Sequence, residues 1–396
     1  MPRMLAPSAD WTPTGPERLR IALVTETYPP EINGVAMTVG RIVAALEQRS
    51  YPVQLIRPRQ ATDVGAPAVN GVEHILVNGL PIPGYSGLKL GLPAKRRLLR
   101  LWSATPPDLV HIATEGPLGW SALNAAHSLD IPVVAGFHTN FHSYSRHYGI
   151  GWLQPAIHGY LRQFHNRAQM TLVPTGALQQ ELQVKGYRNV EVVARGVDSQ
   201  LFSPAQRRAE LRQAWGLDAN GLAVAYVGRL APEKNLALLL RAFEAIERIR
   251  PDARLVLVGD GPARAALQAS HPSFVFCGAK TGQDLAAHYA SADLFLLPSM
   301  TETFGNVLLE AMASGLAVIG FDYAAAAEHV LSQHNGLTVP YGDEAAFVEQ
   351  AAWLSGNPQA MREFGQAARV TALGLSWDSV FDQLEGHYQR LAGRRV

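Results

Sequence analysis

The sequence predicts an α/β protein with two doubly wound, Rossmann-like domains, each a parallel sheet covered by helices on both faces. Short runs of apolar, β-forming residues recur along the chain, and most are followed by a helical pattern or by turn residues. Strands that alternate with helices favour a parallel sheet. The length of 396 residues exceeds one ordinary core and indicates two or three domains.

The first strand–loop–helix unit covers residues 19–48. An apolar strand at 19–25 is followed by a loop with Pro and Gly at 28–34 and a helix at 35–48. Further along the first half, we predict strands at 53–56, 109–112, 132–137 and 170–174, and helices at 118–129 and 175–185. Such short apolar runs are typical of buried parallel strands.

The second half repeats this pattern. We predict strands at 223–227, 255–258, 275–276, 294–297 and 317–319, a helix at 236–250, and a last amphipathic helix at 376–391. The expected divisions are a tail at 1–17, a first domain at 18–193, a second at 194–373, and a C-terminal helix at 374–396 that returns to the first domain. A ligand site is expected where the two domains face each other, at the carboxyl ends of the strands.

Charge is low overall but unevenly distributed. The net charge is +1, which argues against a nucleic-acid partner. Residues up to Ala194 carry +5 and eight of the 13 histidines, whereas the remainder carries −4. The basic half points to an anionic partner, or alternatively to no more than an uneven solvated surface.

Several features are typical of a cytoplasmic protein. The single cysteine, Cys277, allows no intrachain disulfide and lies in an apolar run that predicts a buried strand, so we interpret it as a core residue. The N-terminal tail lacks the apolar segment of a secretory signal. No window of 18 uninterrupted apolar residues predicts a membrane-spanning helix.

Three strand-to-helix loops could bind phosphate, because helix N-termini present unpaired N–H groups. In the first loop, Gly34 opens a helix and gives a ligand close access to the backbone, although a plain tight turn would look the same. In the second, Arg229 and Lys234 could hold a diphosphate from two sides, or could be ordinary solvated charges.

The third loop, at 298–305, is the most specific. Glu302 precedes Gly305, and Glu310 follows inside an otherwise apolar helix. A carboxylate among apolar neighbours costs stability unless it faces solvent or a ligand, which favours a binding role for Glu310. The alternative is one capping glutamate and one exposed helical glutamate.

Two other patterns resemble known sites, one for a dinucleotide and one for a metal ion, but match neither. The run Gly259-Asp260-Gly261 resembles a dinucleotide fingerprint, but Arg264 stands at the third glycine, so we interpret it as a turn. His138 follows a predicted strand with His142 and His147 nearby, but their spacing matches no familiar metal site and no paired-aspartate motif occurs. We therefore predict no metal.

These loops together resemble the retaining glycosyltransferases of family four, which have the GT-B fold. Arg229, Lys234 and the Glu302-x7-Glu310 spacing carry the resemblance, which runs from Arg20 to about Leu391. The stretches 137–140, 194–198 and 321–326 are most similar to bacterial GDP-mannose-dependent α-mannosyltransferases and to sulfoquinovosyltransferases that use a UDP-sugar. One departure is Asn33, where many relatives carry glycine.

The resemblance implies a metal-independent hexosyltransferase without a cofactor, with a nucleotide sugar as co-substrate. It implies the following site: Arg229 and Lys234 on the diphosphate, Glu310 on the ribose, Glu302 on the donor sugar, the backbone of Phe304, Gly305 and Asn306 on sugar and phosphate, His138 beside the reacting carbon, Gly34 near the diphosphate and acceptor, and the base near Phe276 and Gly278.

Alternatives of other classes stay open at this point. A hydride-transfer enzyme is disfavoured by the broken glycine pattern, and a non-catalytic nucleotide-sugar-binding protein by the complete residue set. An inverting transferase would need a general base near the acceptor, a role for which His138 is a candidate.

The acceptor is suggested only by the basic segment 88–102. Pro93 suits a helix start, and the segment holds Lys95, Arg96, Arg97, Arg100 and Trp102 among leucines. Such a helix could lie on an anionic membrane and serve a lipid acceptor, or could pack on the core with a solvated basic edge.

Overall fold

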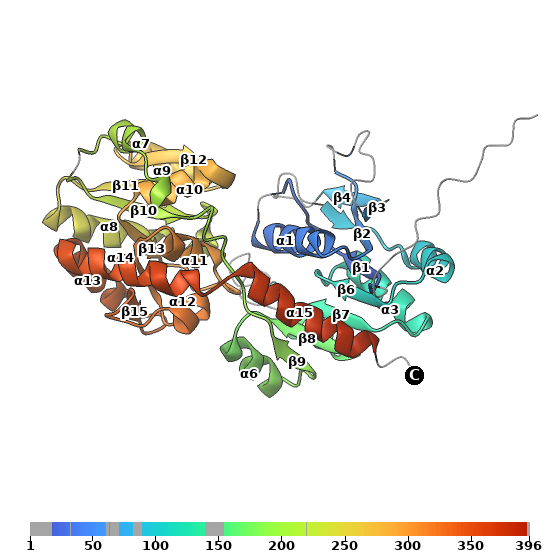
Figure 1. Ribbon diagram of the computed structural model, residues 1–396. Coiled ribbons are helices and arrows are strands. Elements are labelled where there is room, and N and C mark those ends of the chain that lie inside the picture. Colours follow the sequence, from blue (N-terminus) through green and yellow to red (C-terminus); the bar gives the residue numbers. More distant parts are fainter. Residues whose placement is uncertain are drawn as a thin grey trace, which may run out of the picture. The chain divides into compact units, whose positions relative to one another are not determined.

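The computed structural model describes residues 18–31, 33–60, 63, 71–81, 89–138, 154–218 and 220–393 (Figure 1). Its contacts divide the chain into two units, one reaching to Gly136 and resuming at His387, the other spanning Phe137–Gly386. The predicted tail and several residues singled out in the sequence, namely Thr139, Asn140, His142 and His147, lie outside the described residues.

The first unit is organised around parallel strands in the order β3-β2-β1-β6-β7. Its elements are β1 (Ile21–Val24), α1 (Gly34–Gln48), β2 (Val53–Pro58), β3 (Val72–Val77), β4 (Gly79–Pro81), β5 (Lys89–Gly91), α2 (Lys95–Ala104), β6 (Leu109–Ile112), α3 (Pro117–Ser128) and β7 (Val133–Gly136). The central strand β1 is fully buried and pairs in parallel with β2 and β6, whereas β4 and β5 form a separate antiparallel pair.

Helix α1 begins where the sequence predicts, and Asn33 explains why. Its side-chain oxygen accepts a hydrogen bond from the Ala36 N–H at 2.8 Å, which caps the helix. The predicted apolar face of α1, which includes Val39, Ile42 and Leu46, is buried. The departure from glycine at position 33 therefore has a structural role, because a glycine could not supply this cap.

The second unit contains a parallel sheet in the order β12-β11-β10-β13-β14-β15. Its elements are α5 (Gln154–Arg167), β8 (Met170–Val173), α6 (Gly176–Val184), β9 (Val190–Val192), α7 (Ala209–Ala214), β10 (Ala223–Val227), α8 (Leu236–Ile249), β11 (Arg254–Val258), α9 (Arg264–Ser270), β12 (Val275–Gly278), α10 (Gly282–Ser291), β13 (Leu294–Leu297), α11 (Asn306–Ala313), β14 (Ala317–Phe321), α12 (Ala324–His329), β15 (Leu337–Val339), α13 (Glu344–Ser355), α14 (Pro358–Leu373) and α15 (Trp377–Ala392). Short 3₁₀ turns lie at Pro204–Gln206 and Pro232–Lys234.

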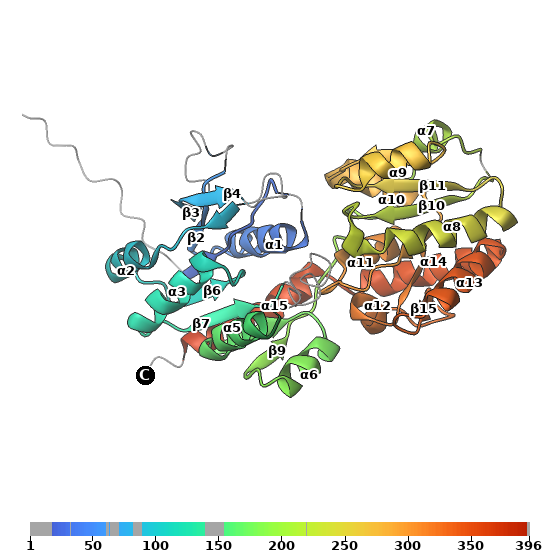
Figure 2. The same ribbon diagram turned by 180° about the vertical axis from the view of Figure 1, so that it is seen from behind.

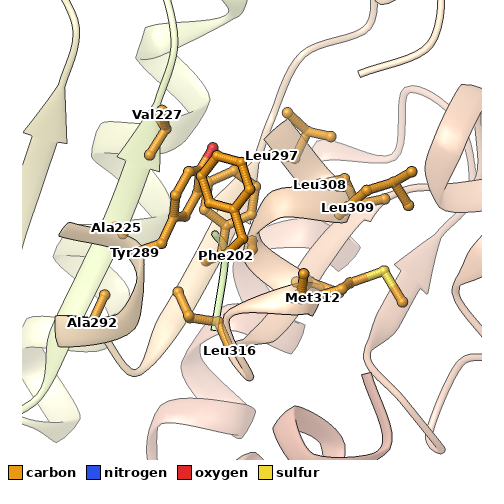
Figure 3. Packing of buried hydrophobic residues seen from close by; sticks show 14 of the residues in the cluster. Phe202, Ala225, Val227, Tyr289, Ala292, Leu297, Leu308, Leu309, Met312 and Leu316 are labelled. Atoms are coloured by element: carbon orange, nitrogen blue, oxygen red, sulfur yellow. The ribbon is translucent and has the colours of Figure 1, made fainter. Parts of the chain in front are cut away.

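Two apolar clusters cover the two faces of this sheet, because successive side chains of a strand point to opposite sides. Along β10, Ala225 and Val227 join the cluster with α10 and α11, whereas Val224 and Tyr226 join the cluster with α8 and α13. Figure 3 shows the first cluster, in which Tyr289 packs among aliphatic side chains. Figure 2 shows helices on both sides of the strands. Burial on both faces accounts for the uninterrupted apolar strands.

The α/β prediction is confirmed, and most of the predicted strands and helices are present within one or two residues. Strand β3 and helices α10, α13 and α14, among other elements, were not predicted from the sequence. Residues at the expected domain boundary near 190 form strand β9. Residues of α15 from His387 onward belong by contact to the first unit, where the Tyr388 hydroxyl lies 2.5 Å from Nδ1 of His111. In the described part of the chain, no helix has the length and apolarity needed to cross a membrane.

Candidate active site

The candidate donor site lies at the carboxyl edge of the second unit's sheet. Strands β10 and β13 are direct neighbours, so the loops that follow them meet at this edge. There the ammonium of Lys234 lies 2.6 Å from Oε1 of Glu302, with both side chains about five-sixths buried, at 15% and 16% exposed. Two residues 68 positions apart in the sequence thus form one ion pair.

The ion pair keeps Glu302 charged. Burial alone would raise the pKa of its carboxyl group, but Lys234 and a hydrogen bond from Ser299 outweigh burial, so the pKa lies below its ordinary value. The carboxylate therefore presents acceptor oxygens only, which suits the hydroxyl groups of a ligand.

Arg229 is held by its own turn. Its guanidinium lies 4.0 Å from Oε1 of Glu233, whose side chain is only 1% exposed. The Tyr226 hydroxyl donates to the carbonyl of Arg229 at 3.0 Å, and the Thr301 hydroxyl donates to the carbonyl of Glu233 at 3.0 Å. These contacts fix the loop after β10 to the loop after β13 and give both cations a defined place.

Close backbone packing at this edge requires glycine at position 259. Its φ is +147°, and a Cβ there would lie 1.9 Å from the carbonyl oxygen of Gly228. The interpretation of Gly259-Asp260-Gly261 as a turn agrees with this packing. Arg264, which stands in place of a third glycine, forms an ion pair with Asp260 at 3.0 Å.

Glu310 lies in the second turn of α11, as the sequence predicts. The buried hydroxyl of Tyr289 donates a hydrogen bond of 2.9 Å to its Oε2, and burial together with this carboxylate raises the pKa of Tyr289 well above its ordinary value. The carboxylate is half-buried, so one polar contact inside the protein stabilises a group that still reaches the surface. A tyrosine that orients Glu310 was not recognised in the sequence.

The backbone enters α11 through a left-handed glycine. Gly305 has a φ of +95°, in the left-handed region that favours glycine, and no side chain caps the helix. N–H groups at such a helix start attract negative charge. Phe304 is buried, and its carbonyl accepts from Ala325.

The remaining predicted residues occupy other parts of the chain. Phe276 and Gly278 lie in β12, with Phe276 half-buried, and Asn306 begins α11. Gly34 begins α1 of the first unit, and among the described residues no atom beyond its chain neighbours and its own helix backbone lies within 4 Å of the position its Cβ would take. Cys277 is half-buried in β12, and burial raises the pKa of its thiol to about 11, which argues against a nucleophile.

His138 is joined to a residue that the sequence analysis did not include among its site candidates. Nη2 of Arg195 lies 2.7 Å from Nδ1 of His138, and Arg195 is buried. The motif at 194–198 drew attention to this stretch, but the chain separation of 57 residues gave no sign of the contact.

The basic helix α2 differs in part from expectation. Lys95, Arg96, Arg97 and Arg100 are exposed, as a surface role requires. The inclusion of Trp102 in this surface is wrong, because its side chain is 1% exposed and packs in the interior beside Leu98. The helix therefore buries its apolar face and presents its cations.

Sequence comparisons identify the family. A family described as "Glycosyltransferase Family 4" matches residues 32–201, and one described as "Glycosyl transferases group 1" matches residues 221–357. A GDP-mannose-dependent α-mannosyltransferase of Mycobacterium tuberculosis is 37% identical, over 96% of this chain and 98% of that protein. The chain belongs to glycosyltransferase family 4. It is therefore an enzyme, as the sequence predicts.

A curated relative with a different name and several solved structures are also similar to this glycosyltransferase. A sulfoquinovosyl transferase of Arabidopsis thaliana is 29% identical, over 90% of this chain and 71% of that protein. Among solved structures, HepE of Anabaena in complex with UDP and glucose has a TM-score of 0.75 at 19% identity, over 94% of this chain and 100% of that chain. WaaG, a glycosyltransferase involved in lipopolysaccharide biosynthesis, has a TM-score of 0.72 at 16% identity, with the same coverage. The fold is GT-B, as predicted.

Proposed function

We propose that this glycosyltransferase transfers mannose from GDP-mannose to an acceptor, without a metal and with retention of the anomeric configuration. The observation that carries the proposal is the Lys234–Glu302 ion pair at the edge where Arg229 and Glu310 also lie. The α-mannosyltransferases of three actinobacteria, 33–37% identical, support the choice of donor.

Residues of the second unit suit each part of the nucleotide sugar, namely the diphosphate, the sugar, the ribose and the base. Arg229 and Lys234 bind the diphosphate, with the N–H groups of Phe304, Gly305 and Asn306. Glu302 accepts from hydroxyls of the donor sugar, and Glu310 accepts from the ribose. The base lies along Phe276 and Gly278. His138 stands beside the reacting carbon.

Charge stabilisation accounts for catalysis without a metal. Breaking the sugar–phosphate bond adds negative charge to the leaving diphosphate. Cations that are already held in place stabilise that charge without reorganising during the reaction, and each such contact contributes about 3 kcal/mol. Arg229 and Lys234 are held in this way by Glu233 and Glu302. The acceptor hydroxyl attacks the sugar carbon from the face that the diphosphate leaves, and the diphosphate takes the hydroxyl proton. Neither an enzymic nucleophile nor a separate general base is then required.

A thermal-shift screen in EDTA tests the donor. We expect GDP-mannose to raise the unfolding temperature more than UDP-glucose, UDP-sulfoquinovose or NADH, because a ligand that binds only the folded state stabilises it. Stabilisation by a UDP-sugar alone would favour a glycolipid synthase, the function named for other relatives. Binding of GDP-mannose without turnover toward any lipid extract would favour a non-catalytic binding protein.

We also propose that the acceptor is a lipid or glycolipid, reached by peripheral contact with the cytoplasmic face of a membrane. Helix α2 exposes four cations within six residues, at 95–100, and the β4–β5 pair, which precedes α2 in the chain, exposes Leu80 and Leu90, at 56% and 38%. Cations attract anionic lipid head groups, and exposed leucines insert among them.

Vesicle sedimentation tests this contact. The protein should sediment with phosphatidylcholine vesicles only when these also contain phosphatidylglycerol. Replacing Arg96 and Arg100 by Gln should weaken the binding about 30-fold, since each cation near an anionic surface contributes about 1 kcal/mol. A matched control replaces Arg248 and Arg362, on helices of the second unit, by Gln. Equal binding to both vesicle types would contradict the proposal.

A further inference from the structure

Among the residues that the structure describes, Arg195 is a buried cation without an acidic partner. Arg195 comes three residues after the end of strand β9 (Val190–Val192), and it is 8% exposed. Within the described residues, no carboxylate forms an ion pair with it, and its guanidinium is directed to Nδ1 of His138 at 2.7 Å. A buried charge that lacks a counter-charge destabilises the folded state, so the presence of a buried arginine at this position requires an explanation.

The contact determines where the protons of His138 lie. Burial lowers the pKa of Arg195 to about 10, so the guanidinium stays charged near neutral pH and can only donate. Nδ1 of His138 must therefore offer its lone pair. In a neutral imidazole with Nδ1 occupied as an acceptor, the proton is on Nε2.

We propose that Arg195 is a positioning residue that fixes His138 as a neutral imidazole protonated on Nε2, so that His138 donates a hydrogen bond to a sugar oxygen and does not act as a general base. The place of His138 beside the sugar rests on the proposed function, whereas its tautomer does not. An imidazolium would set two positive charges 2.7 Å apart, and the other neutral tautomer would set two donors face to face.

Histidine NMR tests the tautomer directly. Protein labelled with ¹⁵N in its histidines should give ring shifts of the Nε2–H form for His138, assigned by their loss in His138→Gln. An Nδ1–H form or an imidazolium at neutral pH would overturn the inference. This measurement needs no substrate, so it stands apart from any failure of GDP-mannose as donor.

Two substitutions separate the hydrogen bond from the charge. Arg195→Gln keeps an N–H donor without the charge and should preserve the tautomer and most of the activity. Arg195→Met removes the donor and should lower kcat about tenfold, the loss expected for one hydrogen bond, with little change in KM for the donor.

A merely structural Arg195 predicts a different pattern. In that case the two variants would lose thermal stability and activity together, and the His138 shifts would not change; that result would overturn the inference. Should Arg195→Met fail to fold, Arg195→Gln decides. In Arg195→Gln, the Nε2–H form together with retained activity supports the proposal, and loss of either one refutes it.

Discussion

Replacing Lys234 by Met leaves the carboxylate of Glu302 buried without its cation. Removing one partner of a buried ion pair destabilises a protein by about 3–5 kcal/mol. Because the two side chains are 15% and 16% exposed, water offsets part of this loss, and we expect about 2–3 kcal/mol. For a unit of this size the unfolding temperature should fall by about 4–12 °C.

The loss of stability in Lys234→Met should be larger at neutral pH than at acidic pH. In the native enzyme the pKa of Glu302 lies below its ordinary 4.5, so the stability it contributes is present above that pH and is lost as the pH falls through the folded value. In Lys234→Met burial, which is the largest effect on this carboxyl group, is opposed only by the hydrogen bond from Ser299, so the pKa should rise above 4.5. The loss in the free energy of unfolding caused by Lys234→Met is therefore complete above the raised pKa. It fades below pH 4.5, where the carboxyl group is protonated.

The assay is calorimetric unfolding of the ligand-free enzyme between pH 4 and pH 8. The double variant Lys234→Met with Glu302→Gln has no buried charge at this pair and should recover much of the stability lost in Lys234→Met. A matched control is Lys280→Met, which breaks the ion pair of Lys280 with Asp284, whose side chain is half exposed. A loss in Lys234→Met that is independent of pH, or one that is not recovered in the double variant, would refute the reasoning.

Three further predictions concern the same unit. Glu310→Ala should weaken donor binding about 10–100-fold, since it removes hydrogen bonds to a charged group, and Tyr289→Phe should weaken it less; calorimetric titration checks both. Arg229→Ala should lower turnover about 100–1,000-fold in a radiolabelled transfer assay, and near-normal turnover would remove it from the site. Gly259→Ala should destabilise the fold because its Cβ lies 1.9 Å from a carbonyl, whereas Gly386→Ala, in open space on α15, should not lower the unfolding temperature.

The fold could be predicted largely from periodicity. Strands such as β10 and β13 are buried on both faces, so they appear as uninterrupted apolar runs. Strand β3 escaped notice because exposed Glu73 and His74 interrupt its buried positions. Helix α13 was missed because its apolar residues are spread around its circumference and not gathered along one face.

The candidate site could be predicted only in part. Glu302 and Glu310 were found because their spacing and neighbours are local in the sequence. Tyr289 and Arg195 could not be found in this way, because each acts on a residue far along the chain, 21 and 57 positions away. A partner fixed by tertiary packing leaves no spacing signal in a single sequence.

Under the proposed mechanism, the ion pairs at the candidate donor site also determine when its cations contribute most. Glu233 and Glu302 already compensate part of the charge of Arg229 and Lys234, so an incoming diphosphate meets a weaker attraction than two uncompensated cations would provide. As the sugar–phosphate bond breaks, negative charge accumulates on the diphosphate and its attraction to the same fixed cations grows. The two cations therefore stabilise the transition state more than they stabilise the bound substrate, which raises kcat and not only affinity.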